Sequence, residues 1–86
     1  MLKSKPIRVN YIGYLREITG VSSEVIDVRD PSLATILSFI TSKYPTLSVK
    51  ILRCAINQIL IHPTDYASTI VKWDSDLKLL IATGGG

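Results

Sequence analysis

Leu77-Lys78-Leu79-Leu80-Ile81-Ala82-Thr83-Gly84-Gly85-Gly86 is an apolar, strand-like run followed by three glycines. In an extended strand, alternate residues of 77–81 would face one side and so form one apolar face. Glycine loses more backbone entropy on ordering than any other residue, so we expect 82–86 to be a flexible tail. We therefore predict one folded domain over 1–81 and a thin arm that carries a carboxylate into a narrow pocket of another protein. A frayed end without a role is the alternative.

The length and composition of the chain fit one small domain. Its 86 residues suffice for a single core, and 47% of them are hydrophobic. A domain of this size cannot hide so many apolar side chains, which favours an exposed apolar patch for a partner over scattered surface aliphatics. No apolar run approaches the length of a membrane span, and the first residues lack the core of a signal peptide. We expect a cytoplasmic protein without a membrane segment.

Several kinds of chemistry are disfavoured by the residues that would have to perform it. One cysteine and one histidine cannot form an intramolecular disulfide or a Cys/His zinc set. Cys54 lies in an apolar run and is predicted to be a buried hydrophobe. The net charge of +3 is spread along the chain, which disfavours nucleic-acid binding, whereas an acidic protein partner is allowed.

Five other side chains could carry chemistry, but each also has a simpler interpretation. Asp74 and Asp76 flank Ser75 and are expected to form a solvated Asx turn rather than an acid/base pair. His62 is expected to be a loop histidine that faces water. The rings of Tyr66 and Trp73 are expected to cover the edge of the core rather than to stack on a ligand.

The first half of the chain predicts two strands and a helix. Residues 7–12 alternate, with Ile7, Val9 and Tyr11 facing the core, and 24–28 form a second strand that pairs antiparallel with the first. Between these strands, 15–20 read as one helical turn closed by a glycine.

The main helix is predicted to begin near Ser32 and to run to about Tyr44. Ser32 or Asp30 is available as the N-cap, and Pro45 ends the helix because the residue before a proline is disfavoured in the helical region. Four apolar residues at helical spacing give it one buried stripe: Leu33, Ile36, Leu37 and Ile40.

The second half predicts a hairpin, a loop and the last strand. Asn57 and Gln58 form a tight turn between strands 53–56 and 59–61. Residues 62–68 are expected to be a loop, 69–73 brief structure and 74–76 a turn, and the pattern leaves 46–52 unassigned. The order predicts an α+β roll: a mixed four- to five-stranded sheet, with strands that the helix separates lying parallel at its centre, and one main helix on one face.

Nearly the whole chain resembles the small ubiquitin-like sulfur carriers with the β-grasp fold, the MoaD and ThiS type. The pieces that carry the resemblance are the first strand leading into 15–20, the hairpin at 55–58, the turn at 74–76, and Gly85-Gly86. The segment 15–17 makes the chain most similar to the small subunit of molybdopterin synthase. It differs from that family at Ala82-Thr83, at Gly84 and in a longer 62–73 loop.

The resemblance implies chemistry at the Gly86 carboxylate, with Gly85 giving it reach. An adenylyltransferase of the ubiquitin-activating type would adenylate the carboxylate with ATP, and a sulfur donor protein would convert the acyl-adenylate to a thiocarboxylate. The large subunit of molybdopterin synthase would then transfer the sulfur to a pterin precursor during molybdenum cofactor biosynthesis. The chain would bind no cofactor itself and would not be catalytic by itself.

Strand parity predicts the docking face for these partners. Ile12, Leu60 and Leu80 point away from the helix-covered side of the sheet, with Arg8 and Lys78 available as a polar rim. Together with Thr83 and Gly84 of the tail, they are the expected partner-binding residues; alternatively, the long loop folds over them.

Three other functions remain open at this stage. The chain could be a ubiquitin-like modifier joined to lysines through Gly86, or a tRNA or thiamine sulfur carrier that uses the same residue. It could also be a non-enzymatic β-grasp interaction module whose tail is incidental.

Overall fold

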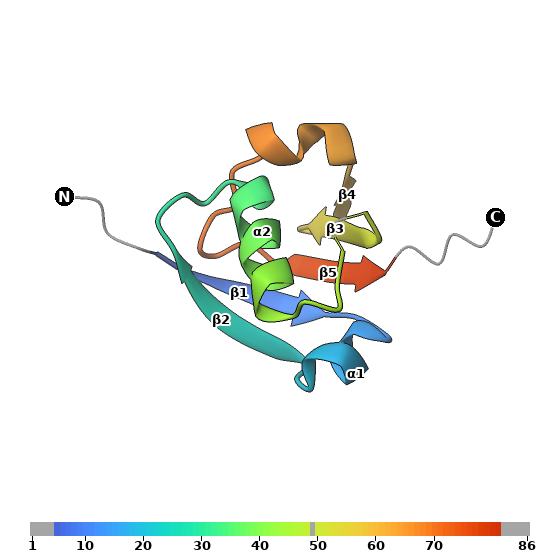
Figure 1. Ribbon diagram of the computed structural model, residues 1–86. Coiled ribbons are helices and arrows are strands. Elements are labelled where there is room, and N and C mark those ends of the chain that lie inside the picture. Colours follow the sequence, from blue (N-terminus) through green and yellow to red (C-terminus); the bar gives the residue numbers. More distant parts are fainter. Residues whose placement is uncertain (1–4, 49, 82–86) are drawn as a thin grey trace.

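The computed structural model describes residues 5–48 and 50–81. One main helix lies across one face of a five-stranded sheet (Figure 1). The elements in chain order are β1 (Lys5–Tyr11), α1 (Leu15–Thr19), β2 (Ser23–Val28), α2 (Leu33–Lys43), β3 (Leu52–Ile56), β4 (Ile59–Ile61), the 3-10 helix η1 (Pro63–Ser68) and β5 (Leu77–Ile81).

The sheet has the strand order β2-β1-β5-β3-β4. β1 and β5 run parallel at its centre, while β2 pairs antiparallel with β1 and β3 pairs antiparallel with both β4 and β5. Parallel neighbours need a crossover connection, which the segment containing α2 and the β3–β4 hairpin provides. The α+β roll with a mixed sheet and one main helix is thus confirmed.

The core lies between α2 and the sheet, as the two periodicities predict. Ile7, Val9 and Tyr11 of β1 are buried, as are Leu77 and Leu79 of β5. The four predicted stripe residues of α2 are buried as well. Each such side chain contributes roughly 1.5–3 kcal/mol through burial, so this layer is the main source of stability. Within the described residues, no helix is long and apolar enough to cross a membrane.

Local signals begin α2 and end both helices where the sequence indicates. The Ser32 side chain accepts a hydrogen bond from the Thr35 N–H and caps α2, while Asp30 accepts from the Ser32 N–H. Tyr44, before Pro45, leaves the helical region at φ −122° and ψ 82°. Gly20 ends α1 with a φ of +80°, a left-handed conformation in which a Cβ is strained.

The β3–β4 hairpin is fastened to the turn before β5. Asn57 and Gln58 have φ values of 51° and 71°, as a two-residue turn with a positive φ at both positions requires. The Asn57 N–H donates to the Asp76 carbonyl at 3.0 Å, and the Asp76 N–H donates back to Asn57 Oδ1 at 2.9 Å. Asp76 also accepts from Asn10 and pairs with Lys78, so the expected solvated Asx turn is instead a junction between β1, the hairpin and β5.

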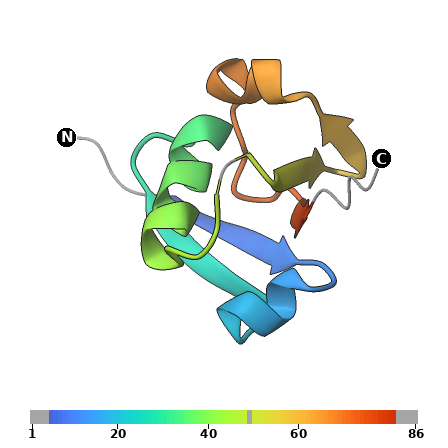
Figure 2. The same ribbon diagram turned by 45° about the vertical axis from the view of Figure 1, so that its right-hand side comes forward.

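The long segment between β4 and β5 differs from the predicted loop. Residues 63–68 form η1, with Pro63 in its first turn and His62 accepting from the Thr64 N–H. Tyr66 is buried as predicted, and the Thr69 carbonyl accepts from Leu33 N–H at 2.8 Å. In both views α1 and η1 lie at opposite ends of the molecule (Figures 1 and 2). η1 packs against α2, and Ile12 and Leu60 stay exposed, so the segment does not fold over these two predicted docking residues. Only its end reaches the open face, where Trp73 lies near Arg8 and Val25.

Trp73 does not cover the core edge, and that prediction was wrong. Its side chain is 65% exposed, because the core position in this segment is taken by Val71. The unassigned connection 46–52 is irregular over its described residues until β3 begins, and Leu47 anchors it in the core.

Candidate functional site

An apolar hollow of about 430 Å³ lies at the end of β5, where the strand leads toward the glycines. It is lined by Ile12, Gly13, Tyr14, Leu80 and Ile81. The hollow exists because the chain leaves β1 beside the last residues of β5, where the Ile12 N–H donates to the Leu79 carbonyl at 2.9 Å. A φ of +63° at Gly13 then turns the backbone away and leaves Tyr14 exposed on the rim.

The structure brings two of the three predicted docking residues together. Ile12 is 41% exposed and lines this hollow with half-buried Leu80. Leu60 is 66% exposed but lies two strands away, opposite Ala55 of β3, while Leu80 is opposite Arg53. The open face thus carries two apolar spots separated by Arg53 rather than one continuous patch.

The second spot has its own hollow, of about 390 Å³. Leu60 lines it with Ile61, His62, Pro63 and Arg53. The Arg53 guanidinium donates to the main-chain carbonyls of residues 50 and 52 at 3.0 and 2.8 Å, so its position between the two spots is fixed. A partner that covers both spots must therefore accommodate a cation between them.

The remaining predicted site residues fall on the tail. Thr83, Gly84, Gly85 and Gly86, and the proposed boundary between 81 and 82, lie outside the described residues. Tyr14 and Ile81 were not predicted as part of the site. The exposure of Tyr14 depends on the Gly13 turn, and Ile81 was expected to face only the core, whereas it packs against the core and also lines the hollow.

Within the described residues, the groups that could perform acid/base or nucleophilic chemistry are engaged elsewhere. Cys54 is fully buried, as predicted, and burial raises the pKa of its thiol to about 11, so the thiolate is scarce at neutral pH. His62 is exposed and is used as the cap of η1. Over 5–48 and 50–81, no three His, Cys, Asp or Glu side chains are grouped as a metal site.

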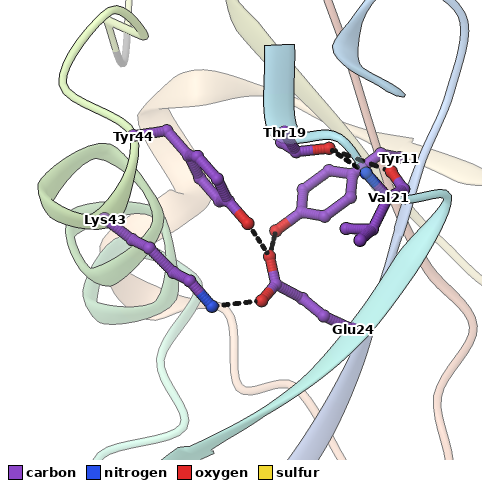
Figure 3. Close-up of polar contacts among 6 residues, drawn as sticks. All are labelled: Tyr11, Thr19, Val21, Glu24, Lys43 and Tyr44. Atoms are coloured by element: carbon purple, nitrogen blue, oxygen red, sulfur yellow. Dashed lines mark hydrogen bonds and ion pairs between the residues drawn. The ribbon is translucent and has the colours of Figure 1, made fainter. Parts of the chain in front are cut away.

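Among the described residues, the side chain with the most side-chain hydrogen-bond partners is Glu24, which the sequence analysis does not single out. Its carboxylate accepts from Tyr11 and from Tyr44, the latter at 2.6 Å, and pairs with Lys43 (Figure 3). Burial would raise the pKa of Glu24, but hydrogen bonds from Lys43, Tyr11 and Tyr44 outweigh it and hold that pKa below its usual range. The cluster joins β1 and β2 to the end of α2, so its role is structural. The sequence signal that could have identified it is strand alternation, because Glu24 shares the inward face of β2 with Ile26 and Val28.

Comparison with known proteins places the chain in a family. The model of the ThiS family matches residues 9–86. No curated protein matches the chain at a significant level.

Solved structures share the fold at low sequence identity. Small archaeal modifier protein 1 from Methanosarcina acetivorans is 20% identical, with a TM-score of 0.74 over 96% of this chain and 98% of that one. A Pyrococcus furiosus protein named as molybdopterin converting factor, subunit 1, is 13% identical, with a TM-score of 0.75 over 91% and 98%. The modifier protein 1 of Haloferax volcanii is 15% identical, with a TM-score of 0.71 over 94% and 99%. The fold is therefore the β-grasp fold of ubiquitin-like sulfur carriers, and the chain belongs to the ThiS family.

Proposed function

We propose that this chain is a sulfur carrier that acts as the small subunit of a molybdopterin synthase, with the Gly86 carboxylate as its reacting group. One observation carries the proposal: in a ThiS-family domain, β5 passes an apolar hollow and leads directly into the sequence Gly84-Gly85-Gly86. The hollow supplies a docking surface, and the glycines supply a chain without side chains that fits a narrow active site.

The chemistry follows from the properties of a carboxylate. The Gly86 carboxylate is a poor electrophile until one oxygen becomes part of a leaving group, so the activating enzyme joins it to the AMP portion of ATP and releases pyrophosphate. A sulfur donor at the oxidation level of sulfide then adds to the acyl carbon, AMP leaves, and a thiocarboxylate remains. A carrier that holds the sulfur beside its acceptor makes the transfer effectively unimolecular. This positioning can lower the activation free energy by several kcal/mol.

The partners take all catalytic roles in this scheme. The chain itself needs no general base, oxyanion hole, metal or cofactor. Docking through Ile12, Leu80 and Tyr14 would position the tail, with Leu60 as a second contact for a large partner. Thr83 and Gly84 would line the entrance to the partner's active site, and Gly85 would lie within it.

A second candidate is a protein modifier whose Gly86 is joined to lysines of other proteins. It is favoured by the likeness of the fold to two structures named small archaeal modifier protein 1. Both candidates share the activation step, so they differ only in what receives the activated carbonyl. Carriers that serve thiamine or tRNA thiolation fall under the same chemistry.

Deletion of Gly84, Gly85 and Gly86 together tests the proposal and separates it from a tail-independent interaction module, because deletion of Gly86 alone would leave a Gly-Gly end with a free carboxylate. The variant should keep the melting temperature of the full chain but should no longer support molybdopterin formation with the large subunit, activating enzyme, ATP and sulfur donor. Unchanged product formation would refute the carrier. If the full chain instead forms lysine-linked adducts in a lysate and makes no molybdopterin, the modifier is correct.

A further inference from the structure

A second exposed apolar surface lies near the start of β5, away from the hollow at the end of that strand. Trp73 is 65%, Ile70 60% and Val25 53% exposed, although all three are large and hydrophobic. Trp73 borders two adjoining hollows, one of about 240 Å³ with Pro6, Arg8 and Val25, and one of about 260 Å³ that includes Ile70 and Lys72. We call this set the Trp73 surface: Pro6, Arg8, Val25, Ile70, Lys72 and Trp73.

The strand register places part of the Trp73 surface on the open face of the sheet. Arg8 of β1 pairs with Val25 of β2, and both point away from α2 because their neighbours Val9 and Ile26 are buried. Arg8 and Ile12 are four residues apart along one extended segment, which corresponds to roughly 13 Å. A short partner segment confined to the Trp73 surface therefore leaves the hollow at the end of β5 accessible.

The charges around Trp73 are mostly positive and are available to a partner. Lys5 and Lys72 line one hollow and Arg8 the other, against Asp74 in the lining and Asp27 opposite Pro6. Over 5–48 and 50–81, the ion pairs are Glu24–Lys43 and Asp76–Lys78, so none of the three cations is neutralised by a described carboxylate. An exposed aromatic side chain with aliphatic neighbours and a basic rim is typical of a protein-binding site.

From this arrangement we infer that the Trp73 surface binds a segment of a partner protein in which an apolar side chain is flanked by carboxylates. The apolar side chain packs on Trp73, and the carboxylates face Arg8, Lys72 and Lys5. The inference does not depend on the chemistry proposed for Gly86. Because the two surfaces are separate, the chain can be held through Trp73 while its tail reacts elsewhere.

Two other occupants fit the surface less well. A second copy related by a two-fold axis would bring the same cations against one another, which opposes association. Single-stranded nucleic acid is bound by several aromatic rings on which successive bases stack. The residues that line the two hollows around Trp73 include no second aromatic ring.

Selection from a displayed library of random short peptides tests the inference. The wild-type domain should enrich peptides with an aromatic or aliphatic residue between Asp and Glu. Trp73 is the only tryptophan in the chain, so peptides that lack tryptophan should change its fluorescence directly when they bind. Replacing their Asp and Glu by Asn and Gln should weaken binding by about tenfold or more.

Variants then locate the site. The affinity of labelled selected peptides should fall by about tenfold or more for Trp73→Ala. Arg8→Gln, a milder change at an exposed position, should reduce both the affinity and its salt dependence. Phe39→Ala, an exposed aromatic on α2, and Leu80→Glu at the other hollow are the matched controls and should bind as the wild type does.

The contrary outcomes are equally definite. Enriched peptides without acidic residues, peptides that bind Trp73→Ala as well as the wild type, or no enrichment over a Trp73→Ala column would each overturn the inference. So would self-association in sedimentation that Trp73→Ala removes, or a larger fluorescence change with polyuridylate than with any selected peptide.

Discussion

Glu24 accepts from more side-chain donors than any other described residue, because three side chains from β1, α2 and its C-cap converge on one carboxylate. Hydrogen bonds to a charged acceptor are stronger than neutral ones, and two of the donors are tyrosines that carry much of their bulk in or against the core. Burial, with hydrogen bonding to Glu24, raises the pKa of Tyr44 and of Tyr11, so both remain donors at neutral pH.

Glu24→Gln should lower the free energy of unfolding by about 1–2 kcal/mol at pH 7, because the charge-assisted bond to Lys43 is lost. The folded-state pKa of Glu24 lies below its ordinary value of 4.5, so ionised Glu24 stabilises the fold above that pH. This contribution disappears as the pH falls through the folded-state pKa. Urea unfolding at pH 7 and at acidic pH should therefore show a difference between wild type and Glu24→Gln that shrinks with acidification.

Glu17→Gln is the control for Glu24, because Glu17 is exposed on α1. It should change stability by less than about 0.5 kcal/mol. An equal loss in both variants, or a Glu24→Gln effect that grows in acid, would contradict the structural role assigned to Glu24.

Leu80 is the residue at which docking is tested most directly. Leu80→Glu places a charge in the apolar hollow and should weaken binding of the activating enzyme by about tenfold or more, with little change in melting temperature because Leu80 faces away from α2. Isothermal titration with the cognate enzyme measures this effect. Phe39→Glu on the exposed side of α2 should bind normally, and equal affinities for all three proteins would show that the hollow is not the docking site.

At the scale of elements, the β3–β4 hairpin contains a strained residue that substitution can relieve. Gln58 has a φ of 71°, a left-handed conformation that costs a residue with a side chain about 1 kcal/mol or more. Gln58→Gly should raise the free energy of unfolding by about 0.5–1 kcal/mol, since Asn-Gly is the preferred pair for this turn. Gln58→Ala keeps the strain and should give no such gain in urea titrations; a gain of the same size in both variants would mean that strain at Gln58 is not the cause.

Elements with one buried face could be predicted from the sequence, as could the helix ends and the hairpin turn, which carry local signals. β1, β5 and α2 each repeat apolar residues at the period of their own geometry. By contrast, η1 has a single buried residue, Tyr66, and begins with a histidine cap, so no period reveals it.

The candidate site could be predicted in part for the same reason. Parity correctly places Ile12 and Leu80 on the open face, because each follows the alternation of its own strand. Whether Leu60 joins them depends on the register of the hairpin, which sets Leu60 opposite Ala55 and leaves Arg53 between the spots. Tertiary contacts, not sequence periodicity, also set the exposure of Trp73 and Tyr14.

At the scale of the whole molecule, the order β2-β1-β5-β3-β4 makes β5 a central strand with a candidate surface near each end. Its start lies near the Trp73 surface, and its end lies at the hollow of Ile12 and Leu80. Because β5 is hydrogen-bonded on both sides, the position from which the tail leaves is fixed by the sheet. A central strand followed in sequence by glycines suits the proposed carrier, which would present one reactive group to several enzymes.

The central claim is that the Gly86 carboxylate is the group that reacts. Intact and fragment mass spectrometry of the chain, after incubation with its activating enzyme, ATP and a sulfur donor, tests that claim most directly. We predict that one oxygen is replaced by one sulfur, that the change maps to Gly86, and that it requires ATP. A chain whose mass stays unchanged with active cognate partners, or a sulfur found on Cys54 instead, would contradict the account.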